Sequence, residues 1–139
     1  MREQEYLEII ADKTAALTAC CCQLGAHYAG APDEVCQRLA RFGRFLGIAF
    51  QIADDLLDML GSEAVAGKSL GTDLTKQKAT LPLIRLLVRA SEQERGEILQ
   101  ILTRSDNHRA AALQPWFRRS DAIDYAQAKA QEYADRAIA

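Results

Sequence analysis

Residues 47–58 read GIAFQIADDLLD, which places three aspartates inside an otherwise apolar stretch. The apolar run extends from about Val35 to Gly61 and contains no proline. Its length favours a helix over a strand. A helix that is apolar on most faces is buried, and carboxylates on it are costly unless a cation or hydrogen-bond donors satisfy them. The stretch therefore predicts a buried helix over residues 34–60 that carries a polar site.

Helical spacing places the polar residues of this stretch on one face, because residues three and four apart are neighbours on a helix. This polar stripe consists of Gln51, Asp54, Asp55 and Asp58. Gly43 and Gly47 continue the stripe and leave room beside it. Three carboxylates within reach of one another repel, and a divalent cation with oxygen ligands, or partner Lys and Arg side chains, relieves this repulsion. The alternative, an ordinary solvated face, fits poorly with the apolar residues on the opposite side of the helix.

The segment after this helix, residues 67–82, reads GKSLGTDLTKQKATLP and carries lysines and glycines. Lys68, Lys76 and Lys78 supply positive charge, and the two glycines allow close approach of the backbone. Mg²⁺ in proteins takes one or two carboxylates, several waters and the phosphates of the substrate. The sequence lacks the P-loop pattern of nucleotide-binding proteins. The carboxylate helix and the lysine segment together predict a site for a diphosphate bridged by Mg²⁺.

Four segments in order carry a resemblance to a known family. FQIADDLLD, GKSLGTDL and KATLPLI resemble the second aspartate-rich region of the trans-isoprenyl diphosphate synthases (polyprenyl synthetases), and EYLEIIADKTAALTACCCQLGA resembles their Lys-Thr helix. The resemblance implies an all-α helical bundle like the later half of the isoprenoid synthase fold, with residues 1–139 as one partial domain. It implies a cytoplasmic trans-prenyltransferase that uses Mg²⁺ to condense an allylic diphosphate with isopentenyl diphosphate into a longer polyprenyl diphosphate.

The resemblance also assigns roles to individual residues. It implies that Asp54 and Asp55 bind Mg²⁺ and the allylic diphosphate, and that Asp58 lies in or just behind the metal shell. The positions that match substrate-contacting residues of the family are Lys13, Thr14, Gln51, Lys68 and Lys78. Together with the aspartate pair, Lys13 and Lys68 are expected to act in catalysis. Without the resemblance, Lys13 is an ordinary surface lysine whose stem lies along the helix.

The sequence departs from the family in ways that affect the expected partners. The family has two aspartate-rich motifs on facing helices, whereas this sequence has one Asp-Asp pair and Gln77 where the family has a glycine. The chain therefore resembles the later half of a synthase, and we expect a homo-oligomer or a second synthase chain that supplies the first motif. A non-catalytic or regulatory subunit of such a pair is the alternative. Two weaker alternatives are a terpene cyclase and a di-metal carboxylate bundle. The paired Glu-x-x-His motifs of such a bundle are absent from this sequence.

The composition of the chain narrows the class of protein further. The 139 residues have a formal charge of −2, which gives no electrostatic reason to expect nucleic acid as a partner. No apolar run approaches the roughly 20 residues of a transmembrane helix, and the N-terminus has no signal-peptide core. Cys20, Cys21, Cys22 and Cys36 have no spacing that suggests disulfides, so we expect small core residues in a reducing cytosol. A zinc site is a remote alternative.

Helical periodicity and end signals predict the remaining elements. The expected helices cover residues 4–29, 80–90, 92–104 and 121–139. Residues 105–115 contain polar and helix-breaking residues and are expected to form a connecting segment. Trp116 and Phe117 are expected to pack against a neighbouring helix.

Overall fold

The computed structural model describes residues 1–60, 78–103 and 109–139, and every regular element in these ranges is a helix. The predicted all-α class is therefore confirmed. The elements are α1 (Glu3–Ile10), the π turn η1 (Ala11–Ala15), α2 (Ala16–Tyr28), α3 (Asp33–Leu60), α6 (Leu81–Arg89), α7 (Glu92–Thr103), α8 (Arg109–Arg118) and α9 (Ala122–Ile138). Lys68 and the other residues of the stretch 61–77, between α3 and Lys78, lie outside the described residues.

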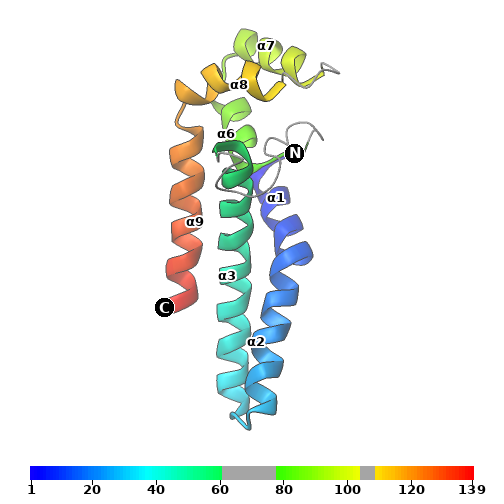
Figure 1. Ribbon diagram of the computed structural model, residues 1–139, viewed down its shortest axis with the longest axis vertical. Helices are drawn as coiled ribbons and strands as arrows, with labels where there is room; N and C mark the ends of the chain where they lie inside the picture. Colours follow the sequence, from blue (N-terminus) through cyan, green and yellow to red (C-terminus); the bar gives the residue numbers. More distant parts are fainter. Residues whose placement is uncertain (61–77, 104–108) are drawn as a thin grey trace.

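The chain begins as one long rod, α1–η1–α2, that runs antiparallel to α3 (Figure 1). Its extent agrees with the predicted helix over residues 4–29. The π turn that interrupts it at Ala11–Ala15, however, was not predicted from the sequence. Single π turns inside α-helices are rare and occur often at functional sites. Gly30 ends the rod with φ +78°, a conformation that glycine adopts without steric penalty.

Two glycines let α2 and α3 approach closely. A Cβ atom added to Gly47 would lie 2.6 Å from the Cα of Ala15, and one added to Gly43 would lie 2.6 Å from the carbonyl oxygen of Thr18. Real Cβ atoms do not come this close to backbone atoms. The room that these glycines leave is thus taken by α2 and not by a ligand.

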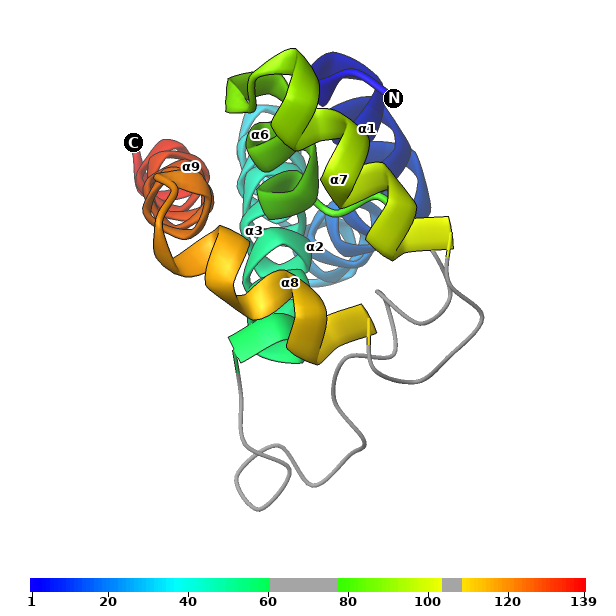
Figure 2. The same ribbon diagram turned by 90° about the horizontal axis from the view of Figure 1, so that it is seen from above.

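Two hydrophobic clusters hold the helices together, and they meet at α6 and α9. The first joins the rod, α3, α6 and α9, and its largest members are Tyr6, Ile10, Ile48, Ile52, Leu56, Leu81 and Ile84. The second joins the end of α3 to α6, α7, α8 and the start of α9, and contains Met59, Leu83, Leu86, Ile98, Leu113, Phe117 and Ala122. Helices α7 and α8 cross the top of the bundle, while α9 runs alongside α3 (Figures 1 and 2).

The second cluster corrects one prediction. Residues 105–115 were expected to form a connecting segment, but α8 begins at Arg109 and has Pro115 inside it. Proline removes one helical hydrogen bond. Leu113 and Phe117 lie four residues apart, so both point into the second cluster, where they are buried. Burial of this helix face outweighs the proline. The expected packing of Trp116 and Phe117 is confirmed.

The four cysteines differ in burial, with Cys22 intermediate between Cys36 and the other two, and none forms a disulfide. Cys36 is buried, as expected of a small core residue, and its Sγ lies 3.6 Å from the carbonyl oxygen of Ala31. Cys20 and Cys21 are exposed, so the expectation that they are core residues is wrong.

Across the ranges that the structure describes, no helix has both the length and the apolar character needed to cross a membrane.

Candidate functional site

The carboxylate of Asp55 is the centre of a buried polar network. The hydroxyl of Tyr6 donates a 2.8 Å hydrogen bond to its Oδ2, while Gln51 Nε2 donates to its Oδ1 at 2.8 Å. The ammonium of Lys78 forms an ion pair with the same Oδ1 at 3.0 Å. Asp55 is 0% exposed. Burying a carboxylate is unfavourable without compensation, and these three donors, one of them a cation, supply it.

The network continues to the π turn through Gln51. The hydroxyl of Thr14 donates to Gln51 Oε1 at 2.9 Å, so the Gln51 amide accepts from Thr14 and donates to Asp55. Four residues that the sequence assigned to the site are therefore linked directly to one another. We refer to Tyr6, Thr14, Gln51, Asp55 and Lys78 as the inner network.

The other two aspartates of the stripe lie beside this network. Asp54 is half-buried and Asp58 is 3% exposed, and both have interaction partners. Among residues 1–60, 78–103 and 109–139, no three His, Cys, Asp or Glu side chains are grouped so that they could hold a metal ion. Joint metal binding by Asp54, Asp55 and Asp58 thus stays a prediction.

Of the two lysines predicted to be catalytic, the structure describes only Lys13, which is not part of the inner network. Lys13 lies in the π turn next to Thr14 and is exposed. In the described ranges it forms neither a hydrogen bond nor an ion pair with the aspartates. Lys68 lies outside the described residues. The structure therefore brings Thr14, Gln51, Asp55 and Lys78 together and leaves the roles of Lys13 and Lys68 as predictions.

Tyr6 is the member of the inner network that the sequence analysis did not identify. It is 2% exposed and lies four residues before Ile10 on the buried face of α1. One signal for its role was available. A buried tyrosine hydroxyl usually requires a hydrogen-bond partner, and the predicted aspartate stripe was an obvious acceptor.

The carboxylates of the site decide which metal ion it can hold. Mg²⁺ commonly takes one or two carboxylates from the protein and completes its shell with water and substrate phosphates. The half-buried Asp54 fits such a site. Asp55 fits it poorly, because both its oxygens accept hydrogen bonds from the protein and one of them faces an ammonium. A three-carboxylate cage is not supported by this arrangement.

A second polar cluster joins α1, α6 and α9 nearer the surface. The guanidinium of Arg85 pairs with the carboxylate of Asp121, with Nε 3.2 Å from Oδ1, and it lies 4.2 Å from the ring centre of Tyr125. The hydroxyl of Tyr125 donates to Glu3 at 2.8 and 2.9 Å. We refer to Glu3, Arg85, Asp121 and Tyr125 as the outer cluster.

The outer cluster also perturbs the proton affinities of its members. The hydrogen bond from Arg85 lowers the pKa of Asp121, and the same bond raises the pKa of Arg85. Burial raises the pKa of the Tyr125 hydroxyl, and its hydrogen bond to Glu3 raises that pKa further. All three shifts favour the charge states seen in the cluster at neutral pH.

The fold and the inner network define an all-α protein in which a long helix presents an aspartate pair beside a lysine and a π turn. Comparison with known proteins identifies the family. Residues 1–117 match the family model described as Polyprenyl synthetase, and the chain belongs to this family. The resemblance of the sequence motifs to this family is confirmed.

Two curated relatives show how similar the chain is to other members of this family. The chain is 40% identical to heptaprenyl diphosphate synthase component 2 of Geobacillus stearothermophilus, over 96% of this chain and 41% of the relative. It is 47% identical to a geranylgeranyl diphosphate synthase of Mycobacterium tuberculosis, over 78% of this chain and 33% of the relative. The chain thus spans less than half the length of these curated relatives.

A solved structure shows the same fold. A geranylgeranyl pyrophosphate synthase of Corynebacterium glutamicum, solved in complex with calcium and isoprenyl diphosphate, superposes with a TM-score of 0.83 at 30% identity. The superposition covers 97% of this chain and 42% of that one. The arrangement of α1 to α9 is therefore that of a part of an isoprenyl synthase fold.

Proposed function

We propose that this chain forms part of a Mg²⁺-dependent trans-prenyltransferase that condenses an allylic diphosphate with isopentenyl diphosphate to make a longer polyprenyl diphosphate. The observation that carries the proposal is the inner network. It gathers Thr14, Gln51 and Lys78 from three separate segments around Asp55, next to the half-buried Asp54. Membership of the polyprenyl synthetase family supports the same activity.

The proposed roles follow from the chemistry of the residues. Lys78 and Lys13, with Lys68 of the preceding segment, would stabilise the negative charge of the diphosphate as it leaves. Thr14 and Gln51 would orient it by hydrogen bonds. Bound Mg²⁺ would neutralise part of the diphosphate charge, with Asp54 as its ligand on this chain and Asp58 beside it. The apolar faces of the helices would keep water from the reacting hydrocarbon.

The test measures binding of inorganic pyrophosphate to the 139-residue chain by calorimetry, with and without Mg²⁺. Asp54→Asn is expected to abolish the Mg²⁺-dependent part of the binding. Asp124→Asn, which changes an exposed carboxylate on α9, serves as the matched control and is expected to bind like the unchanged protein. Equal binding by the Asp54 and Asp124 variants would contradict the site assignment.

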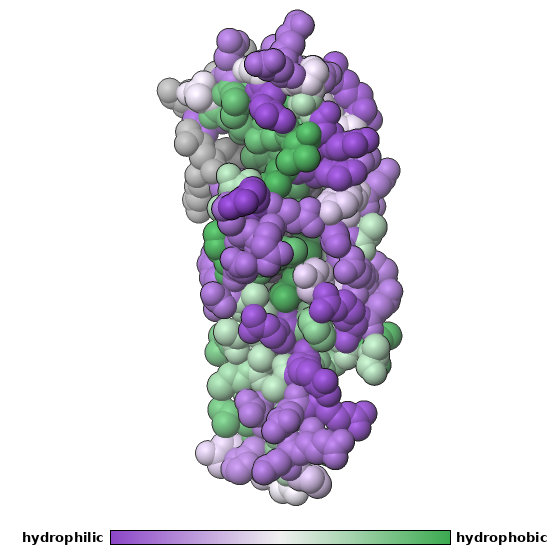
Figure 3. Space-filling view, turned by 180° about the vertical axis from the view of Figure 1, so that it is seen from behind, coloured by the Kyte–Doolittle hydropathy of each residue, from purple (hydrophilic) through white to green (hydrophobic). Residues whose placement is uncertain are grey.

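A second candidate function has its own support. We infer that the chain works with another synthase chain, either as a catalytic half or as a non-catalytic subunit. Along α3 a row of apolar side chains is exposed, comprising Val35, Leu39, Leu46, Phe50 and Leu57. Contiguous exposed apolar surface is typical of interaction sites. Apolar areas also interrupt the polar surface on the face shown in Figure 3.

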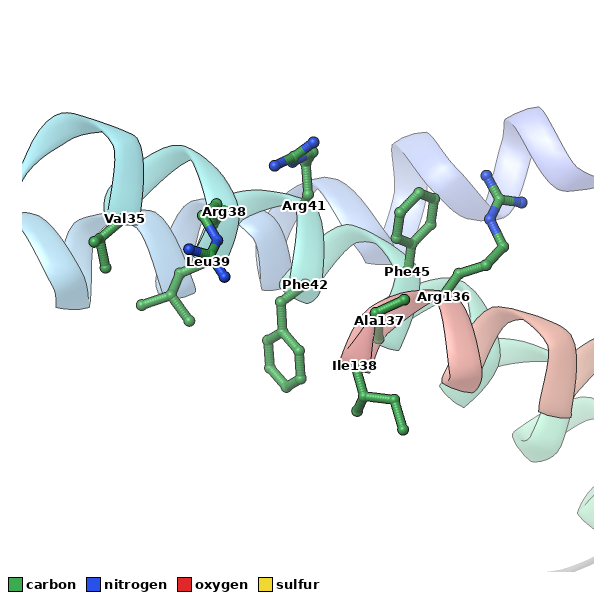
Figure 4. Close-up of a pocket in the computed structure, with 10 residues that line it drawn as sticks. Val35, Arg38, Leu39, Arg41, Phe42, Phe45, Arg136, Ala137 and Ile138 are labelled. Carbon is green, nitrogen blue, oxygen red and sulfur yellow. The ribbon is translucent and has the colours of Figure 1, made fainter.

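The lower half of α3 lines a groove next to this surface. A groove of about 610 Å³ lies between Leu39, Phe42 and Phe45 of α3 and the last turn of α9, where Ile138 points into the same space as Phe42 (Figure 4). α9 reaches only partway along α3, so α2 is the neighbour of α3 below this point (Figure 1). The relative in Geobacillus stearothermophilus is named a component of its enzyme, which is consistent with a two-chain arrangement.

The two candidates are separated by one experiment on the natural gene product. Its assembly state is measured by native mass spectrometry, and prenyl transfer is assayed on the same sample with both diphosphates and Mg²⁺. Turnover in a complex with a second synthase-like chain supports a catalytic half. A complex in which the Asp54→Asn change leaves turnover unaffected supports the non-catalytic role.

We also propose a cellular location for the protein. The cysteines of the chain are all free thiols, including the two exposed ones, which is typical of a reducing compartment. We therefore place the protein in the cytoplasm, where disulfides do not form readily.

A further inference from the structure

The carboxylate of Asp55 has little capacity left to bind a ligand. A carboxylate offers about four lone-pair sites. In Asp55, three of them accept hydrogen bonds from Tyr6, Gln51 and Lys78. A cation placed at Oδ1 would also lie against the ammonium of Lys78, and like charges repel. Asp55 therefore holds protein groups in this fold, whatever Asp54 binds.

The groups that Asp55 holds are themselves useful for binding a diphosphate. The side chain of Lys78 is 35% exposed while that of Asp55 is 0% exposed, so the lysine is anchored inside and reaches toward the surface. Gln51 is fixed at both ends of its amide, by Asp55 and by Thr14. One buried carboxylate thus sets the position of two side chains that contact the proposed ligand.

Tyr6 fixes the carboxylate in turn. Its hydroxyl is the donor at Oδ2, the oxygen that neither Gln51 nor Lys78 contacts. Without this bond the carboxylate would be held at one oxygen only, and rotation about its Cβ–Cγ bond would move the acceptor of Lys78. The packed surroundings of Tyr6, which is 2% exposed, keep its own ring in one place.

We propose that Tyr6 and Asp55 are positioning residues of the diphosphate site. Tyr6 holds the Asp55 carboxylate in one orientation, and Asp55 holds Lys78 and Gln51 toward the diphosphate. The diphosphate as ligand rests on the proposed function; the positioning of Lys78 does not.

The chain contains a matched control for a change at Tyr6. Tyr125 is also a tyrosine whose hydroxyl donates to the carboxylate of a different helix, that of Glu3. Tyr6→Phe and Tyr125→Phe each remove one oxygen atom and one tyrosine–carboxylate hydrogen bond. Only the first change touches the inner network, so a difference between them reports on positioning and not on the loss of a hydrogen bond as such.

The first experiment measures binding of inorganic pyrophosphate with Mg²⁺ by calorimetry, at a temperature where circular dichroism shows all variants fully folded. Tyr6→Phe is expected to weaken binding about tenfold, as for a lost hydrogen bond to a charged group. Tyr125→Phe is expected to leave it unchanged. Unchanged binding by Tyr6→Phe, or equal weakening by both variants, overturns the proposal.

The second experiment needs no ligand. The ¹⁵Nζ resonance of Lys78 is expected to report an ordered ammonium in the unchanged protein and in Tyr125→Phe, and a mobile one in Tyr6→Phe. Asp55→Asn, which keeps the shape of the side chain but removes its charge, is expected to mobilise Lys78 as well. An ordered Lys78 in both inner-network variants overturns the proposal.

The two readouts separate this inference from the proposed function. If the unchanged protein does not bind pyrophosphate but Lys78 loses order only in the inner-network variants, the positioning role stands and the diphosphate assignment fails. If pyrophosphate binds with the same affinity to every variant, the diphosphate assignment stands and the positioning role fails.

Discussion

The inner network and the outer cluster are built from the same chemical groups in different surroundings. Each contains a tyrosine hydroxyl that donates to a carboxylate on another helix, and each pairs a cation with an aspartate. They differ in burial, since Asp55 is 0% exposed whereas the side chain of Asp121 is 46% exposed. Breaking a buried ion pair strands a charge away from water, whereas a surface pair is replaced by water and salt. The inner network is therefore expected to contribute more to stability.

The largest difference between the two clusters is expected on removal of the aspartates. Asp55→Ala leaves the hydroxyl of Tyr6 and the ammonium of Lys78 without their acceptor, and we expect a loss of about 3 kcal/mol in the free energy of unfolding. Partial exposure of Lys78 keeps the loss at the low end for a buried pair. Asp121→Ala is the control and is expected to cause a much smaller loss. Urea denaturation of both variants measures the difference, and losses of equal size would remove the distinction between the clusters.

A change that removes no polar group sharpens the comparison further. Gly47 lies one turn before Gln51 on the face of α3 that contacts α2. Gly47→Ala is expected to push the two helices apart, to strain the Thr14–Gln51 hydrogen bond, and to lower the free energy of unfolding by about 2 kcal/mol through overpacking. The outer cluster lies elsewhere, so the pairing of Arg85 with Asp121 is expected to persist.

Gly96 is the control for this second prediction. It lies inside α7, and a Cβ atom added there would meet nothing within 4 Å. Gly96→Ala is therefore expected to raise the free energy of unfolding by up to about 1 kcal/mol, because alanine favours the helix. Thermal melts followed by circular dichroism give both values, and a Gly47→Ala variant as stable as Gly96→Ala would contradict the close packing of α2 on α3.

Much of the fold followed from the sequence because its signals are local. The length of the apolar run predicted α3, and periodicity with end signals predicted a helix over residues 80–90, where α6 spans Leu81–Arg89. What the sequence did not show depends on contacts between distant segments. Pro115 argued against a helix locally, but burial of Leu113 and Phe117 in the second hydrophobic cluster stabilises α8 across it.

The candidate site was predictable to a similar degree. Helical spacing correctly placed Gln51 and Asp55 on one face, because residues four apart are neighbours. Spacing cannot tell that Asp55 accepts from Tyr6 of α1 and from Lys78, and the assignment of Asp55 as a metal ligand did not anticipate Tyr6. Nor does any local pattern of side chains specify the π turn that carries Lys13 and Thr14.

The smallest effect is expected from acid and salt acting on the outer cluster. The pKa of Asp121 is lowered in the folded protein, with the hydrogen bond from Arg85 as the main cause, so its carboxylate stabilises the fold above its unfolded pKa of about 3.9. This contribution is lost as the pH falls through the lower folded pKa. The difference in free energy of unfolding between the unchanged protein and Asp121→Asn is therefore expected to stay constant from pH 7 to pH 5 and to shrink below about pH 4. It is also expected to shrink in about 1 M salt, where the screening length is about 3 Å. A difference that grows toward acidic pH would contradict the lowered pKa of Asp121, and one that salt leaves intact would contradict a solvent-exposed ion pair.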